Sequence, residues 1–208
     1  MIYRPPLPLL AASLLALSAH AEEAPPRRSL WGGRTLVDGN ALWANMSAGL
    51  DMTGLLALQV GYVRALRRDV DVGASVGAIA GVGRAYGGGV KARYHFARFG
   101  SFDLATELPL SLQVYTDGPP PHLYVYGAEP ALMMSWTTTA RTELYYGAAA
   151  RGFLTSDTVM AGPEARVGGS YTYKAFSVFA TGRASWLYAT LTPPQATFSL
   201  DAGASVQF

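Results

Sequence analysis

The feature that most constrains this chain is a two-residue alternation of apolar and polar side chains that recurs along most of its length. Residues 198 to 208 carry apolar side chains at every even position and small or polar side chains at every odd one. A β-strand points alternate side chains to opposite faces, so this pattern predicts a two-faced strand. The pattern recurs about ten times between residues 39 and 208, which predicts an all-β fold.

The predicted strands are long, at roughly ten to fifteen residues against a usual five or six. Tilted strands of about ten residues are what a lipid bilayer requires. Gly, Pro, Asp and Ser fall between the strands, as turns need. The first set of predicted turns is Thr53–Gly54, 84–89 (in which Gly87-Gly88-Gly89 is interpreted as a flexible turn), 117–121, Ser156–Asp157 and Pro193–Pro194. The set at the opposite end is 67–69, 98–101, 137–140 and Tyr173–Lys174.

Alternation alone does not say whether the apolar face points inward, as in a soluble lipocalin-like barrel, or outward against lipid. Only 14% of the residues are charged, against about a quarter in a typical soluble domain. The polar face is mainly Gly, Ala, Ser and Thr, and aromatic residues gather near strand ends on the apolar face. Arg64 and Arg98, the charges expected on the apolar face, lie next to predicted turns. These features favour an outward apolar face, with a soluble periplasmic ligand-binding barrel as the alternative.

The first 21 residues are predicted to be a secretory signal peptide. Arg4 supplies the positive region, residues 7–19 are apolar, and Ala19-His20-Ala21 fits a cleavage site. Residues 22–38, rich in Pro, Arg and Gly, are expected to form an exposed, extended periplasmic segment. The barrel then spans residues 39–208, where no apolar run reaches the length of a membrane helix.

Taken together, these features resemble a small bacterial outer-membrane β-barrel protein. The terminal Phe208, with Leu200, Ala202, Ala204 and Val206 at alternate positions, resembles the C-terminal signal read by the barrel assembly machinery. Two of its apolar places hold Ala, a departure from the larger residues that the signal favours. The resemblance implies an outer-membrane location with periplasmic termini, and as partners the surrounding lipid and the assembly machinery. We expect a monomer.

We therefore predict a closed antiparallel transmembrane β-barrel of about ten strands, with eight or twelve as alternatives. Its lumen would be only slightly wider than one that side chains fill. The charged groups predicted to face this lumen are Asp71, Lys91, Arg93, His95, Asp103, Glu107, Glu129, Glu143, Arg151, Glu164, Arg166 and Arg183, together with Asp51 and Asp201. The aromatic side chains predicted to fill it are Trp43, Phe99, Tyr115, Tyr145, Phe153 and Phe179.

Two interpretations of the inward charges remain open at this point. Lys91 and Arg93 share one predicted strand, and carboxylates lie on the strands before and after it, within reach across a ladder. The charges either form an internal salt-bridge network that satisfies buried groups, or they line a narrow polar pore and bias which ions pass.

Catalytic and cofactor sites find little support in the sequence. The chain has no Cys and three His, which makes a metal site improbable on composition, and we expect no cofactor. A net charge of +2 with no basic run argues against nucleic acid. A lipid-modifying enzyme that used His122 with Ser156 and with Asp117 or Asp157 is the catalytic alternative. The expected role is a non-enzymatic barrel, either structural or a narrow channel for small solutes and ions.

Overall fold

The computed structural model describes residues 30–36, 39–50, 55–81, 83–117, 123–189 and 192–208. The predicted signal peptide, Asp51 and His122 lie outside these residues. No helix long and apolar enough to cross a membrane occurs among the described residues. The strands are β1 (Asn40–Gly49), β2 (Leu56–Arg67), β3 (Val70–Ala80), β4 (Ala85–Phe99), β5 (Phe102–Tyr115), β6 (Leu123–Ala128), β7 (Ala131–Thr137), β8 (Thr142–Leu154), β9 (Val159–Tyr173), β10 (Phe176–Ala189) and β11 (Thr192–Gln207).

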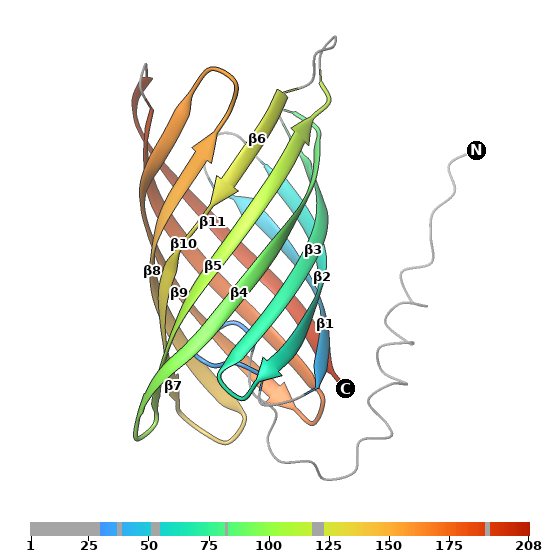
Figure 1. The fold of residues 1–208 in the computed structure, drawn as a ribbon, viewed down its shortest axis with the longest axis vertical. Helices are drawn as coiled ribbons and strands as arrows, with labels where there is room; N and C mark the ends of the chain where they lie inside the picture. Colours follow the sequence, from blue (N-terminus) through green and yellow to red (C-terminus); the bar gives the residue numbers. More distant parts are fainter. Residues whose placement is uncertain (1–29, 37–38, 51–54, 82, 118–122, 190–191) are drawn as a thin grey trace, which may run out of the picture.

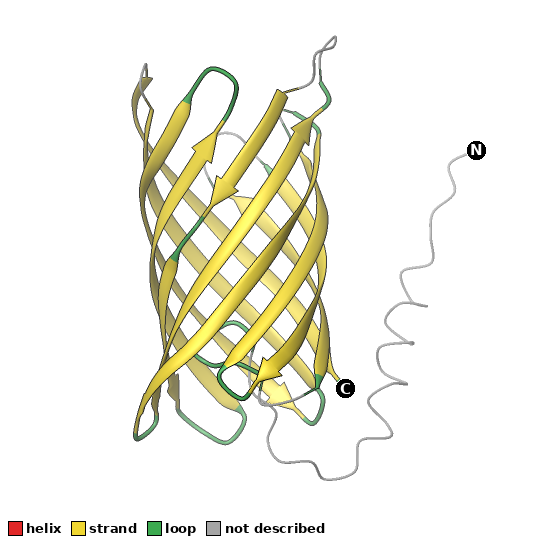
Figure 2. Cartoon of the chain, viewed as in Figure 1, coloured by secondary structure: helices red, strands yellow, loops and turns green. Residues whose placement is uncertain are grey.

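The strands form one closed antiparallel barrel in which each strand pairs with its neighbours along the chain (Figures 1 and 2). β6 and β7 are consecutive parts of one wall strand, because both lie between β5 and β8 in the same register and only Glu129–Pro130 separates them. The wall therefore has ten strands, as the sequence predicts. The first and last strands close it, with Trp43 opposite Ser205.

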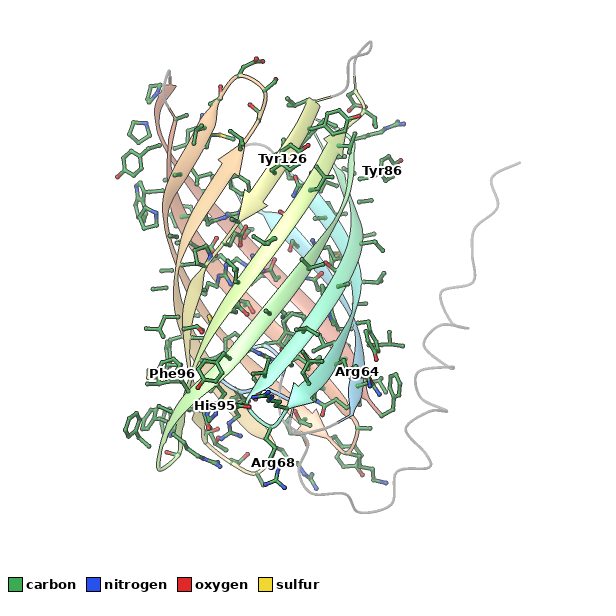
Figure 3. The ribbon with its side chains drawn as sticks, in the orientation of Figure 1. Arg64, Arg68, Tyr86, His95, Phe96 and Tyr126 are labelled. Atoms are coloured by element: carbon green, nitrogen blue, oxygen red, sulfur yellow. The ribbon has the colours of Figure 1, made fainter. Side chains whose placement is uncertain are left out.

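The apolar face of the wall points outward. Leu58, Val60 and Val76 are 56%, 54% and 62% exposed on its outer surface, whereas Asp71, at a position of the opposite parity on β3, is fully buried on the lumen side. Exposed aromatic residues lie toward both ends of the barrel: Tyr86 and Tyr126 at one end and Phe96 at the other (Figure 3). This is the arrangement of a membrane barrel and the reverse of the lipocalin-like alternative.

A register shift corrects the expected faces of two residues. β4 carries an irregularity between His95 and Ala97, after which Arg98 lies opposite Asp103 and Phe99 opposite Phe102. The extra residue of such a bulge reverses the parity of the positions that follow it. Arg98 therefore belongs to the lumen side and forms an ion pair with Asp103, and Phe99 is exposed outside; both were expected on the opposite face.

Two of the predicted turns are also wrong. Residues 87–89 lie inside β4, and Pro193 and Pro194 lie at the start of β11. A Cβ added at Gly87 or Gly89 would come within 2.7 Å or less of a β5 carbonyl oxygen, so glycine is required there for close approach of two strands. Proline is tolerated at the start of a strand because its missing N–H does not interrupt the ladder there.

The N-terminal segment departs most from expectation. Residues 22–38 were expected to be exposed, but Leu30, Thr35 and Leu36 are at most 2% exposed. Figure 1 shows residues 30–36, in blue, inside the end of the barrel where Phe208 lies. We refer to this end as the Phe208 end and to the opposite one as the far end.

The outward face predicts a depth-dependent response to charge. Val60 lies near the middle of β2 and Leu66 beside its turn, and their side chains are similarly exposed, at 54% and 57%. In lipid, Val60→Arg should lower the free energy of unfolding by about 2–4 kcal/mol and Leu66→Arg by no more than about 1 kcal/mol. Urea unfolding in lipid vesicles measures both. Equal, small effects would show that water, not lipid, surrounds the wall.

Candidate functional site

The lumen is the candidate site. Of the fourteen charged residues predicted to face it, thirteen are described; all of them face it and none is exposed, since eight are buried and Lys91, His95, Glu129, Arg151 and Arg183 are half-buried. Ten of them form two groups along the barrel. The central cluster comprises Glu107, Glu129, Arg151, Glu164 and Arg166. The end cluster, near the Phe208 end, comprises Asp71, Arg93, His95, Asp103 and Glu143.

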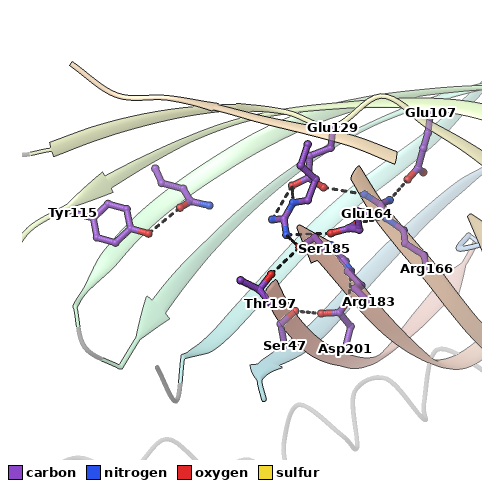
Figure 4. Close-up of polar contacts among 12 residues, drawn as sticks. Ser47, Glu107, Tyr115, Glu129, Glu164, Arg166, Arg183, Ser185, Thr197 and Asp201 are labelled. Atoms are coloured by element: carbon purple, nitrogen blue, oxygen red, sulfur yellow. Dashed lines mark hydrogen bonds and ion pairs between the residues drawn. The ribbon is translucent and has the colours of Figure 1, made fainter. Parts of the chain in front are cut away.

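Arg166 organises the central cluster (Figure 4). Its guanidinium lies 2.5 Å from Glu164, 2.6 Å from Glu107 and 2.9 Å from Glu129. Arg151 forms a second bridge between two of the same carboxylates, at 3.2 Å from Glu129 and 3.1 Å from Glu164. The five side chains come from four wall strands, so they tie β5, β8 and β9 to the β6–β7 junction across the lumen.

Further polar contacts extend this group toward β11 and β1. Arg183 pairs with Asp201, which also accepts a hydrogen bond from Ser47, and the hydroxyls of Ser185 and Thr197 lie 2.7 Å apart. Every guanidinium group of the extended cluster, those of Arg151, Arg166 and Arg183, lies against at least one carboxylate. Charge pairing of this kind satisfies groups that would otherwise be costly to bury.

The end cluster is built around two fully buried carboxylates, Asp71 and Asp103. Arg93 lies 2.7 Å from Asp71. His95 lies 3.0 Å from Asp103, and Arg98 lies 3.5 Å from the same carboxylate. Neighbouring strands therefore bring together the acids and bases that the sequence places on adjacent strands.

Residues 30–36, which we call the N-terminal plug, complete the end cluster. Arg34 donates to the Asp103 carboxylate at 2.5 Å and to the Thr137 hydroxyl. The Leu36 amide donates to Asp71 at 3.1 Å, and Arg93 donates to the carbonyl oxygens of Leu30 and Gly32 at 2.6 and 3.2 Å. Wall side chains, not a strand ladder, make these bonds.

The plug also covers apolar surface inside the lumen. Leu30 and Leu36 pack with Ala41 and Val63 of β1 and β2. Trp31 packs against a second apolar group on β7 and β8, which includes Met133. Lumen walls of membrane barrels are usually polar. The two apolar patches at this end therefore indicate a surface that binds a segment inside the lumen.

Glycines make room for the aromatic rings that meet the plug. Trp31 stacks on Phe179 with ring centroids 3.8 Å apart and meets Trp43 edge-on at 5.2 Å. A Cβ added at Gly61 would lie 2.5 Å from the Trp43 ring, and one at Gly203 2.5 Å from the Phe179 ring. The two rings therefore lie close against the wall and present surfaces to Trp31.

A cavity of about 610 Å³ occupies the rest of the lumen. It ends on Leu30 and Trp31 at the plug and reaches Ile79, Tyr115 and Thr155 near the far end. Lys91 lines it, with its ammonium 5.4 Å from the centroid of the Trp31 ring. Glu107, Glu129, Arg151 and Arg166 of the central cluster form part of its wall, so the cavity passes charged side chains between the far end and the plug.

The residues of the catalytic alternative are not brought together in any way the structure shows. Asp117 accepts a 2.5 Å hydrogen bond from the Arg84 amide at the far end, and His122 lies outside the described residues. His95 lies at the opposite end of the barrel, paired with Asp103. Among the described residues, no group of three or more His, Cys, Asp or Glu side chains is arranged to hold a metal ion.

The proposed assembly signal lies on the closing strand. Leu200, Ala202 and Phe208 are exposed, Ala204 is half-buried and Val206 is buried. Leu200, Ala202, Ala204 and Val206 face the same way as their partners on β1, so the predicted alternation is present. Recognition by an assembly machinery stays a prediction.

The plug was not predicted from the sequence, although a signal for it was present. Val63 and Met133 lie at positions whose parity points inward, where polar or very small residues were expected. Large apolar residues on that face indicate a partner inside the lumen. The Leu30–Trp31 pair was the apolar candidate in the preceding segment.

No family model matches this chain, and no curated protein matches it. Among solved structures, a bacterial polysaccharide outer membrane secretin is similar, with a TM-score of 0.53 at 9% sequence identity. The match covers 82% of this chain and 65% of the secretin chain, less than two thirds of that length. This chain has the fold of outer-membrane β-barrels.

Two smaller barrels are similar over nearly their whole length. KdgM porin matches with a TM-score of 0.45 at 10% identity, covering 81% of this chain and 99% of that one. The N-terminal β-barrel domain of Pseudomonas aeruginosa OprF matches with a TM-score of 0.41 at 15% identity, covering 82% and 98%. At such identities the likeness concerns the fold alone.

The central cluster predicts a large effect from removing its organising cation. Arg166→Met would leave three carboxylates without their shared partner and should lower the free energy of unfolding by about 3–5 kcal/mol. Arg64→Met, on the exposed outer face near the β2–β3 turn, is the matched control and should change it by less than about 1 kcal/mol. Urea unfolding in vesicles compares them. Equal effects would show that the cluster contributes no net pairing energy.

Proposed function

We propose that this protein is a non-enzymatic barrel of the outer membrane that forms a narrow channel for small solutes and ions. The observation that carries the proposal is the cavity, which runs from the far end of the barrel to the plug between charged side chains. The Phe208 end would face the periplasm, with outer-membrane lipid around the wall and the assembly machinery as a transient partner.

The lumen chemistry suits weak, selective passage better than tight storage. Lys91, Arg151, Arg166 and Arg183 line the cavity together with Glu107, Glu129 and Asp201, so both signs of charge meet a passing solute. Charged rings and narrow bores select among ions while binding them weakly enough to release them.

Recordings from planar bilayers test the channel directly, using protein whose insertion has been confirmed by heat-modifiable migration. Two forms are compared: the unaltered chain, and a chain in which residues 30–36 are replaced by an equally long Gly/Ser stretch. Discrete conductance steps from the second form are expected, because the cavity then continues to the Phe208 end. If neither inserted form conducts, the channel proposal is overturned and a structural role takes its place.

The charge of Lys91 should bias ion preference. In the chain with the Gly/Ser stretch, Lys91→Gln removes a positive charge from the cavity wall and is expected to shift the reversal potential under a salt gradient toward cations. Lys174→Gln is the matched control, because Lys174 is exposed in the turn between β9 and β10. An unchanged reversal potential for Lys91→Gln would place the ion path elsewhere.

A further inference from the structure

We propose that the N-terminal plug is a dissociable internal ligand, held in a peptide-binding site at the Phe208 end of the lumen, and that its release opens the barrel. The site is selective for an arginine that follows two glycines. The gating part rests on the proposed channel function, whereas the binding site stands without it.

The contacts of the plug are those of a bound peptide. Its backbone is held by side chains of the wall: Ser135 accepts from the Gly33 amide at 2.5 Å, Asp71 from the Leu36 amide, and Arg93 donates to two carbonyl oxygens. A segment integrated into the wall would instead use strand ladders. Because no ladder is broken when the plug leaves, the barrel wall can persist without it.

The site keeps internal partners for its buried charges when it is empty. Asp71 retains Arg93 at 2.7 Å, and Asp103 retains His95 and Arg98 at 3.0 and 3.5 Å. Neither carboxylate would be left as an isolated buried charge, the state that makes the loss of a partner most costly. The wall is therefore equipped for both an occupied and an empty site.

The shape of the site explains its selectivity. A Cβ at Gly33 would lie 2.9 Å from both the Met133 carbonyl oxygen and the Ser135 amide, and still closer to the Asp103 carbonyl. Backbone atoms cannot yield as side-chain ends do, so a larger residue at position 33 is excluded. The guanidinium of Arg34 then reaches Asp103 and Thr137 in a charge-assisted pair of hydrogen bonds.

Apolar contacts provide the remaining attraction. Leu30 and Leu36 are 1% and 2% exposed, and Trp31 stacks on Phe179 at 3.8 Å. Without the plug, the apolar patches around Val63 and Met133 would face water in the lumen. Burial of such surface favours occupancy, so the closed state is the resting state.

Binding is tested on the barrel whose residues 30–36 are replaced by Gly/Ser, folded in lipid nanodiscs. The probe is a fluorescently labelled peptide, Leu-Trp-Gly-Gly-Arg-Thr-Leu, followed by anisotropy up to about 1 mM, the effective concentration that a short tether supplies. Saturable binding is expected. The peptide with Ala at the Arg34 position should bind about tenfold more weakly, because it lacks the hydrogen bonds to a charged group. A peptide with Ala at the Gly33 position should also bind more weakly.

Gating is tested on the same barrel in planar bilayers. The peptide added on the Phe208 side should close the channel, and the Arg34→Ala peptide should do so only at about tenfold higher concentration. In the full chain, Gly33→Ala should raise the frequency of openings. Gly182→Ala is the matched control, since a Cβ there would lie 3.9 Å from its nearest neighbour.

The outcomes separate the two proposals. Saturable peptide binding without conductance in any inserted form would overturn the channel and support the peptide site. Conductance of the full chain equal to that of the Gly/Ser chain, or the absence of saturable binding, would overturn the dissociable plug. The channel would stand in that case, provided that the Gly/Ser chain conducts.

Discussion

Backbone hydrogen bonding in an apolar medium is the constraint on which this structure depends. Lipid offers neither donors nor acceptors, so a strand that crosses it must be paired on both sides. The β1–β11 ladder meets that requirement by joining the two ends of the sheet, with Trp43 opposite Ser205. The same ladder fixes the register of β1 against β11. A shift of either strand by one residue would turn the apolar side chains of that strand inward.

Closure has a direct consequence for the interior. The charged residues on the lumen face lie close together inside ten strands, and several of them, such as Asp71 and Asp103, are fully buried. Each therefore needs a partner inside the barrel. Arg166 meets three carboxylates within 2.9 Å, and Asp103 meets Arg34, His95 and Arg98. The pairs of Arg166 with Glu107 and Glu129 join strands that are not adjacent, so they also stiffen the wall.

The two halves of the lumen have different chemistry. Toward the far end the cavity is continuous, charged side chains of the central cluster line part of it, and it carries the proposed solute path. Toward the Phe208 end, inward apolar side chains such as Val63 and Met133 replace polar ones, and the plug covers them. A barrel with such an interior has a built-in means of closure, because the energy of burying this surface is available only when the segment is in place.

Much of the wall could be predicted from the sequence, since period two is a property of a single strand and requires no knowledge of its neighbours. The outward apolar face, the ten strands and the proximity of Arg93 to Asp71 followed from the alternation and from pairing between consecutive strands. Two local features of β4 escaped it. The bulge after His95 reversed the faces of the wall to which Arg98 and Phe99 belong. The glycines at 87–89 lie within the strand because the neighbouring backbone approaches closely there.

The position of the plug was decided by the tertiary structure alone. Residues 30–36 have no periodicity, and their composition suits an exposed linker. Their partners, Asp71, Asp103 and Ser135, come from β3, β5 and β7 and converge only when the barrel closes. The sequence by itself determined a two-faced wall and its inward charges, because alternation acts within each strand. What fills the lumen depended on contacts between distant strands, which no local pattern encodes.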